Sequence, residues 1–259
     1  MTLEIILSCM HQSNTDIVSL SNIKSDTIII NQCNFNDYYE EYINRNKIRM
    51  FSTTTRGLSC SRNMAIRNST ADICLVADDD EYFLSGYEEK IINSFKRIPQ
   101  ADVIAFKIER LNGNKKKYPN KIKKLTSWDC LKVASVEIAF KREKILEKKI
   151  QFDENVGSGV SKAGGEENIF LHNCIKNNLS IYFVPETILQ LKPSESQWNE
   201  NIFSEQYFID RGRFTKKLIY GKTFATIYAF YFAIMKWHKY KHKTSFIKAL
   251  NSMLKGIFE

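Results

Sequence analysis

Short, continuous apolar runs alternate with helix-like segments over the first two thirds of the chain, and this alternation restricts the fold more than any other feature. The runs at 3–7, 27–30, 48–52, 73–77 and 103–108 are apolar at consecutive positions, which is typical of strands covered on both faces. Helix-like segments lie between them at 37–45, 59–68 and 85–97. This order predicts an α/β fold with a mostly parallel, doubly wound sheet.

The pattern changes in the last third of the chain. We expect a strand at 133–140, a helix at 165–178 and a last strand at 181–184, closed by Pro185 because proline cannot donate to a sheet. After about Ser194 the sequence is helical, aromatic and basic. We therefore divide the chain into an α/β domain, 1–194, and a helical extension, 195–259.

Charge and cysteine usage exclude several classes of function. The net charge is +9, yet the stretch from Arg211 to Glu259 holds eleven Lys and Arg against one acid. The rest of the chain is close to neutral, so we expect no nucleic-acid partner. The six cysteines form no C-x-x-C pair, which favours reduced, buried thiols in a cytoplasmic protein over disulfides or a zinc site. The apolar run at the start is too short for a secretory signal.

Three aspartates follow the apolar run at 73–77 directly. Asp78, Asp79 and Asp80 then stand at the carboxyl end of a buried strand, where α/β sheets bind ligands. Adjacent carboxylates repel one another unless a cation lies among them, and oxygen ligands suit Mg²⁺ or Mn²⁺, which also bind diphosphates. The alternative is a solvated acidic turn.

The segment 56–63 reads as the start of a helix. Gly57 permits a tight turn and Ser59 is the expected N-cap. Helix starts favour anions, and Arg56 and Arg62 add charge-assisted hydrogen bonds to a diphosphate. The alternative is an ordinary capped helix with surface arginines.

A second acidic pair opens the helix expected at 165–178. Glu167 shares one helical face with Leu171, so it should point toward the body of the protein. A carboxylate beside an acceptor hydroxyl can take its proton, an effect typically worth ~10²–10⁴-fold in rate. The alternative is that Glu166 and Glu167 only complement the helix dipole.

Taken in order along the chain, these motifs resemble glycosyltransferase family 2, an inverting family of GT-A fold, in the type that serves bacterial polysaccharide biosynthesis. The likeness covers 3–185, with some reach to Arg213. It is carried by Gly-Leu-Ser-x-x-Arg-Asn at 57–63, by D-x-D at Asp78 and Asp80, and by a Gly-Glu-Asp type of helix start at 165–167. The resemblance implies a Rossmann-like sheet flanked by helices and a single displacement at the anomeric carbon.

The resemblance also implies roles for individual residues. Asp80 and Asp78 would hold Mn²⁺ or Mg²⁺, and Glu167 would be the catalytic base beside Glu166. The residues expected to contact a nucleotide-sugar, with a UDP-sugar favoured, are Ser8, Cys9, Gln32, Arg56, Ser59, Arg62, Asn63, Asp78, Asp79 and Lys192.

Several positions depart from the family pattern. Glu167 stands where Asp is commoner, Gln32 ends the second strand where many relatives have acids, and Lys192 stands near the place of a metal-binding His. Lys192 is expected to bind phosphate directly. Glu137 is a candidate for the acceptor side, with a buried, ion-paired acid as its alternative.

The extension has an aromatic, apolar run at 224–237 with lysines on both sides. This run is too short and interrupted for a spanning helix, and basic flanks favour an interfacial helix on an anionic membrane. Helices packed on the catalytic domain are the alternative.

The resemblance implies a hexosyltransferase type of enzyme, and the extension predicts that it is peripheral at the inner face of the plasma membrane. It would move a sugar to a hydroxyl of a glycan or a lipid-linked glycan in surface polysaccharide synthesis. Two rivals remain: a metal-dependent nucleotidyltransferase, which also needs acids at a strand end, and a non-catalytic membrane adaptor that works through the basic extension.

Overall fold

The computed structural model describes residues 1–111, 116–192, 202–219 and 221–259. Its strands are β1 (Leu3–Met10), β2 (Asp26–Gln32), β3 (Asp37–Ile43), β4 (Asn46–Thr53), β5 (Ile73–Asp78), β6 (Glu81–Phe83), β7 (Val103–Arg110), β8 (Lys123–Lys124), β9 (Ile138–Lys141) and β10 (Ile181–Leu191). Its helices are α1 (Asp16–Leu20), α2 (Leu58–Asn68), α3 (Tyr87–Arg97), α4 (Ser127–Cys130), a 3₁₀ turn (Ser135–Glu137), α5 (Arg142–Glu147), α6 (Glu166–Lys176), α7 (Glu205–Leu218), α8 (Lys222–Tyr240) and α9 (Phe246–Phe258).

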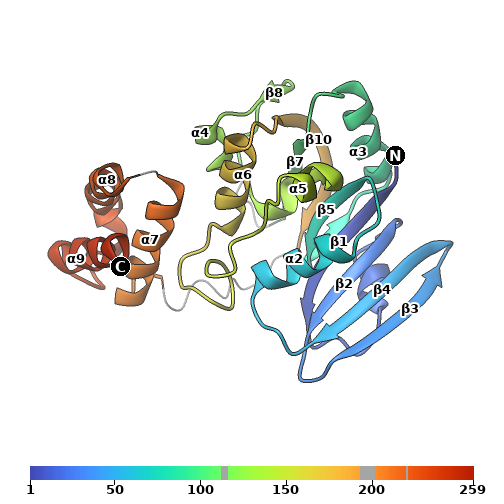
Figure 1. Ribbon diagram of the computed structural model, residues 1–259, viewed down its shortest axis with the longest axis horizontal. Coiled ribbons are helices and arrows are strands. Elements are labelled where there is room, and N and C mark those ends of the chain that lie inside the picture. The colour runs from blue at the N-terminus through green and yellow to red at the C-terminus, as the bar shows by residue number, and fades with distance from the viewer. Residues whose placement is uncertain (112–115, 193–201, 220) are drawn as a thin grey trace.

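One large sheet forms the centre of the molecule (Figure 1), with strand order β3-β4-β2-β1-β5-β9-β7-β10-β6 and β8 beside β10. Strands β4, β2, β1 and β5 pair in parallel. Strand β9 is antiparallel to both β5 and β7, so β7 and its parallel partner β10 run in the same direction as β1. The predicted mostly parallel α/β sheet is confirmed. Its carboxyl ends meet at one edge, where ligands bind in such folds.

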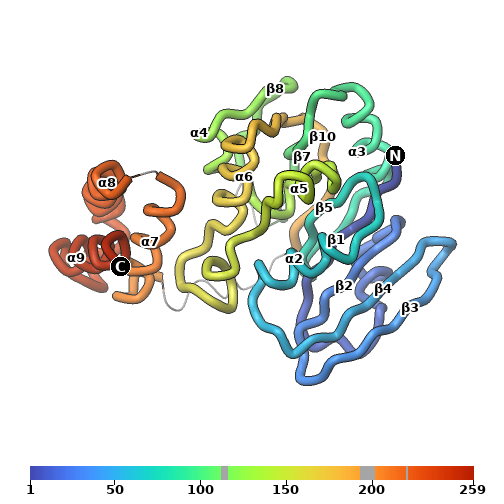
Figure 2. Tube along the Cα trace, viewed as in Figure 1, coloured from blue at the N-terminus to red at the C-terminus, as the bar shows by residue number. Residues whose placement is uncertain are grey.

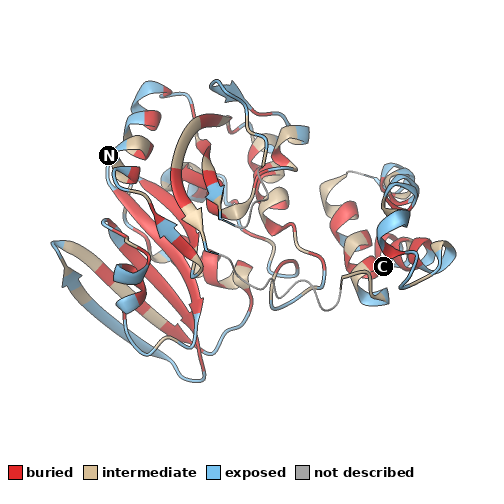
Figure 3. Cartoon of the chain, turned by 180° about the vertical axis from the view of Figure 1, so that it is seen from behind, coloured by how far each residue is buried: buried red, intermediate tan, exposed pale blue. Residues whose placement is uncertain are grey.

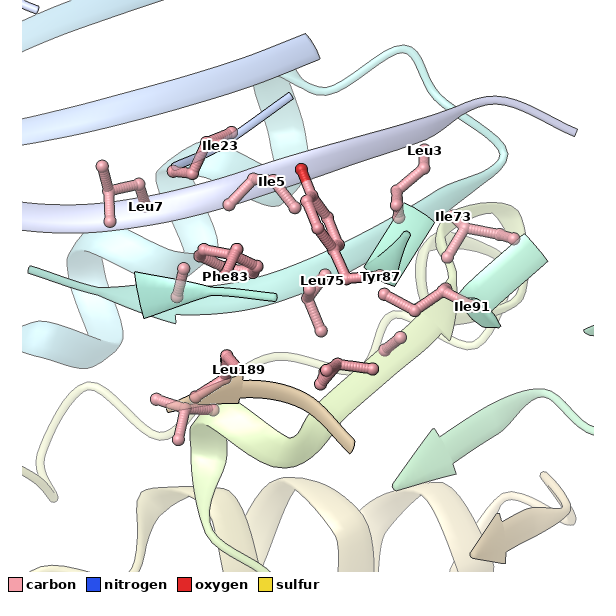
Figure 4. Packing of buried hydrophobic residues seen from close by; sticks show 14 of the residues in the cluster. Leu3, Ile5, Leu7, Ile23, Ile73, Leu75, Phe83, Tyr87, Ile91 and Leu189 are labelled. Carbon is pink, nitrogen blue, oxygen red and sulfur yellow. The ribbon is translucent and has the colours of Figure 1, made fainter. Parts of the chain in front are cut away.

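Helices cover both faces of the sheet, as the continuous apolar runs predict. Alternate residues of β1 enter different clusters: Ile5 and Leu7 pack with α1 and α3, whereas Ile6 packs with α2, α5 and α6. Figure 4 shows the first cluster, in which Tyr87 and Ile91 of α3 lie against the strand residues. Figure 3 shows that the inner strands are buried while β3, at the edge, is largely exposed.

The prediction of a helix at 37–45 is wrong, because the segment forms β3, the outer strand of a hairpin with β4. The register pairs Ile43 with Asn46, so the connection is the two residues Asn44 and Arg45. Both have positive φ, 50° and 74°, the conformation that tight hairpin turns require. The polar composition of this segment reflects an edge strand rather than a helix face.

Two other element boundaries differ from expectation. Strand β10 does not end at Pro185 but continues to Leu191, because its register with β7 shifts between Phe183 and Thr187 and places the proline in an irregularity. The strand expected at 133–140 begins only at Ile138, after the 3₁₀ turn.

Helices α7, α8 and α9 form a cluster with its own core, which includes Phe208, Phe232, Tyr240 and Met253. The cluster lies at one end of the molecule, with α7 nearest to α6 (Figure 2). The boundary predicted after Ser194 falls within 193–201, outside the described residues. Over the described part of the chain, no helix combines the length and the apolar character that crossing a membrane requires. All six cysteines are free thiols, five of them buried.

Candidate active site

A cleft of about 1110 Å³ opens at the carboxyl edge of the sheet. The ends of β1, β2, β5 and β10 contribute to it, together with the starts of α2 and α6 and one residue of α7. Ten of the predicted site residues line it: Ser8, Cys9, Gln32, Arg56, Asp78, Asp79, Asp80, Glu166, Glu167 and Lys192. The aspartates after β5 and the glutamates of α6, far apart in sequence, therefore share one cavity large enough for a drug-sized ligand or larger.

The acidic turn after β5 is held by its neighbours. Asp78 accepts two hydrogen bonds from Arg62 Nη2, at 3.1 and 3.2 Å, and its own N–H donates to Glu81 Oε1 at 3.0 Å. The carbonyl of Asp80 accepts from the Lys192 N–H at 2.9 Å, which ties the turn to the end of β10. Burial raises the pKa of Asp78 and Asp79, because their charged forms lose solvent.

Carboxylate oxygens at this edge suit a divalent cation. Asp78, Asp79 and Asp80 offer hard oxygen donors to the same cleft, and a cation among them would offset the cost of burying neighbouring negative charges. No three His, Cys, Asp or Glu side chains in the described residues are arranged to hold a metal by themselves. Mg²⁺ is often held by one or two carboxylates and completed by substrate phosphates and water, so the donor set fits a metal that binds together with a diphosphate.

Helix α2 begins differently from the prediction. Its N-cap is Gly57, with φ +109° and no side-chain cap, rather than Ser59. Ser59 is buried and donates to the carbonyl of Val156 at 2.9 Å. The Gly57 N–H donates to Gln32 Oε1 at 2.8 Å, so Gln32 shapes the entrance of α2 and also faces the cleft.

Three predicted donor-contact residues lie behind the cleft rather than on it. Ser59, Arg62 and Asn63 do not line it. The Asn63 amide donates to the Phe152 carbonyl at 2.9 Å and Asn63 Oδ1 accepts from the Phe152 N–H at 2.9 Å. Ser59 and Asn63 bond to protein groups, as do both terminal nitrogens of Arg62, so we expect all three side chains to support the site and not to touch a donor.

Arg62 joins the two acidic motifs. Its side chain is fully buried, with Nη1 2.8 Å from Glu166 Oε1 and Nη2 bonded to Asp78 and to Ser135 Oγ. Its predicted contact with a departing nucleotide is replaced by these bonds. The guanidinium instead fixes the distance between the end of β5 and the start of α6.

The two glutamates of α6 have different surroundings. Glu166 is 4% exposed and accepts from Arg62 and from the Gly165 N–H at 3.2 Å. Glu167 is half-buried on the cleft wall. Burial, and then the charge of Glu166, raise the pKa of Glu167 to about 8. Of the pair, Glu167 is the carboxyl group poised to exchange a proton with a bound molecule near neutral pH.

The remaining predicted residues also line the cleft. Ser8 Oγ accepts from Ser61 Oγ at 2.7 Å. Burial raises the pKa of the Cys9 thiol to about 12, so this thiol is neutral. Arg56 Nη2 donates to Asn34 Oδ1 at 2.8 Å, and Lys192 is exposed beside the aspartates.

Glu137 does not face the cleft, which corrects its assignment to the acceptor side. It is 1% exposed, forms an ion pair with Lys116 at 2.5 Å and accepts from Tyr118 Oη at 2.7 Å. Glu137 is therefore a buried, ion-paired acid, as the alternative interpretation of the sequence expects.

The cleft also contains residues that the sequence motifs did not indicate, among them Arg110, Ser135 and Arg211. Arg110 is the last residue of β7, so its position at a strand end was a usable signal. Arg211 lies in α7, and nothing in its local sequence distinguishes it from the other bases of the extension.

The match to known families covers most of the sheet. Residues 3–163 match the family model described as Glycosyl transferase family 2. No curated protein matches the chain.

Solved structures of S. aureus TarS are similar over nearly the whole chain. TarS 1–349 in complex with UDP-GlcNAc has a TM-score of 0.70 at 14% identity, over 99% of this chain and 82% of that one. TarS 1–349 in complex with UDP has a TM-score of 0.65 at 12% identity, over 99% and 81%. A longer TarS structure has a TM-score of 0.59 at 12% identity, over 100% of this chain and 55% of that one. At these identities the likeness establishes a shared fold.

Proposed function

This chain belongs to glycosyl transferase family 2, and from that premise we propose that it transfers a sugar from a UDP-sugar to a hydroxyl group of a glycan acceptor. The observation that carries the proposal is that Glu167 and the aspartates after β5 line one cleft. A base and a diphosphate-binding edge on one cavity are what a sugar transfer requires.

The donor would lie across the carboxyl ends of β1, β2 and β5. Ser8, Gln32, Asp78 and Asp79 line this edge, and we propose that the first two contact the nucleoside and the aspartates its ribose. Lys192 is exposed beside them, and we propose that it binds the diphosphate. We propose uridine as the base because the S. aureus TarS structure of the same fold contains UDP-GlcNAc.

The chemistry follows from the position of Glu167. The carboxylate of Glu167 takes the proton of the acceptor hydroxyl while that oxygen bonds to the anomeric carbon. The bond from this carbon to the diphosphate oxygen breaks, UDP leaves with the electron pair, and the configuration inverts. Arg62 contributes indirectly, because its ion pairs hold Glu166 and Asp78 in place. Proton transfer of this kind is typically worth ~10²–10⁴-fold in rate.

Asp80, with Asp78, would hold Mn²⁺ or Mg²⁺. Such an ion, when bound, neutralises charge on the departing diphosphate. We expect Asp80, which the family resemblance assigns to the metal, to matter most for metal affinity, and Asp78 carries the Arg62 ion pair as well.

We also propose that the extension places the enzyme on an anionic membrane, at the inner face of the plasma membrane, beside a lipid-linked glycan acceptor in surface polysaccharide synthesis. Helix α8 exposes a row of apolar side chains at helical spacing: Phe224 (66% exposed), Ile227 (60%), Tyr231 (58%) and Ile234 (62%). Lysines flank this row on both sides. Apolar faces with basic flanks are typical of interfacial helices, and each Lys near an anionic leaflet adds about 1 kcal/mol.

The experiment that tests the function is a donor panel with the purified chain. UDP-, GDP- and ADP-sugars are supplied with Mn²⁺, Mg²⁺ or a chelator, and the released nucleotide is identified. We expect UDP release from a UDP-sugar, reduced by the chelator. Pyrophosphate as the product would instead indicate a nucleotidyltransferase, and no reaction with any donor would support a non-catalytic adaptor.

A further inference from the structure

Arg211 brings a positive charge from the extension into the catalytic cleft. It lies in α7 and lines the same cavity as Glu167. Its guanidinium carbon is 4.7 Å from the Phe214 ring centre and 4.9 Å from that of Phe232, and its Nη2 donates to Tyr228 Oη at 3.2 Å. Rings of α7 and α8 therefore hold the side chain in one orientation.

This charge has no carboxylate partner among the described residues. Arg211 Nε is buried and has no hydrogen-bond partner there. Arg62, by contrast, pairs with Asp78 and Glu166, and Arg213 pairs with Asp210 and Glu259. A half-buried guanidinium without a counter-charge costs free energy, and a bound anion removes that cost.

The position of Arg211 assigns it to the side of the cleft that holds the base. Phe214, on the next turn of α7, packs against Gly165, where an added Cβ would come within 2.4 Å of the ring. Gly165 immediately precedes Glu166 and Glu167 at the start of α6. The aspartates, in contrast, belong to the strand ends where the donor diphosphate is proposed to lie.

We propose that Arg211 binds a phosphate group of the acceptor, so that the extension supplies part of the acceptor site and selects acceptors that carry a phosphate near the attacked hydroxyl. The proposal rests on the proposed function, because it takes Glu167 to mark the acceptor side. A planar guanidinium suits a phosphate because it offers two parallel N–H donors. The segment that matches the family ends at residue 163, so this contact belongs to the part of the chain outside that match.

The test measures binding of inorganic phosphate to the full chain at saturating UDP, which fills the donor diphosphate site. The variants are Arg211→Gln, Arg211→Lys and, as a control on the same helix, Arg213→Gln. We expect Arg211→Gln to weaken phosphate binding about tenfold or more, the loss of one charge-assisted contact. UDP affinity should change by less than about twofold. Arg213→Gln should leave both affinities unchanged, and Arg211→Lys should retain part of the phosphate affinity.

Each other outcome has a definite meaning. Equal phosphate binding by wild type and Arg211→Gln, or no phosphate binding by the UDP complex, overturns the proposal. A loss of UDP affinity in Arg211→Gln would assign Arg211 to the donor diphosphate and overturns it as well. Circular dichroism and Arg211→Lys separate a binding defect from a folding defect. Failure of the proposed function looks different, because the wild-type chain would then neither bind UDP nor release it from a UDP-sugar.

Discussion

Arg62 Nη1 lies 2.8 Å from Glu166 Oε1, although the two residues are 104 positions apart in the chain. Neither residue is more than 4% exposed. The pair joins α2 to the start of α6, and the same guanidinium also reaches Asp78 at the end of β5. Residues that the motifs place in a substrate site therefore build the frame that holds that site.

Removing one member of this pair should destabilise the fold. Arg62→Met leaves two acids facing each other with no counter-charge, and breaking a buried ion pair in this way costs about 3–5 kcal/mol. Urea denaturation followed by circular dichroism measures the free energy of unfolding. Lys144→Ala, which removes the surface pair with Glu147, is the control and should change it little. An equally small change in Arg62→Met would mean that the pair does not hold α2 and α6 together.

The pH dependence of the reaction should report on Glu167. Burial and the charge of Glu166 raise the pKa of this carboxyl to about 8. A general base must be deprotonated before it can accept a proton, so kcat/KM should rise with pH, by about tenfold per unit well below the pKa, and level off above it. Initial rates between pH 5.5 and 9.5 measure this profile. A flat profile from pH 6 to 9 would exclude Glu167 as the titrating base.

The sequence predicts those features of the fold and the site that depend on a local pattern of residues. The parallel core strands are continuous apolar runs, and such a sheet brings Asp78, at the end of a strand, and Glu167, at the start of a helix, to one edge. The sequence predicts Glu166 as a site residue but not its ion pair with Arg62, because a partner 104 positions away leaves no local signal.

The predictions that are wrong, or that are missing, also concern features with no local sequence signal. The hairpin of β3 depends on positive φ at Asn44 and Arg45, which overrides a composition that also suits a helix. Ser59 has the chemistry of an N-cap but donates to Val156 instead. Arg211 enters the cleft only because α7 packs on α6, a tertiary contact that no motif encodes.

Gly165→Ala should loosen the contact between α6 and α7. The new Cβ would lie 2.4 Å from Phe214 Cε2, and the residue has φ +122°. Overpacking costs about 1–3 kcal/mol, in addition to the strain of a positive φ. Gly221→Ala is the matched control, since φ is +95° there and nothing lies within 4 Å of the added atom. Thermal denaturation should show a larger loss of stability for Gly165→Ala, and equal losses would contradict the contact.

Membrane association should depend on the exposed row of α8. Ile234→Glu replaces an apolar side chain that is 62% exposed with a charge that an anionic leaflet repels. Because burying an Ile side chain is worth about 1.5–3 kcal/mol, binding to phosphatidylglycerol vesicles should fall about tenfold or more. Tyr42→Glu, at a 67% exposed position of β3, carries the same charge change and should bind like wild type. Flotation at low salt measures both, and unbound wild-type protein would refute membrane docking.

In the proposed reaction, Glu167 takes a proton from the acceptor during sugar transfer. Its most direct test is the rate of UDP release from a UDP-sugar in the presence of acceptor, compared between wild type and Glu167→Gln, with UDP affinity measured in parallel. Loss of the base should lower kcat by about 10²–10⁴-fold while UDP binds both proteins with nearly equal affinity. A Glu167→Gln protein that turns over at the wild-type rate would show that Glu167 is not the base.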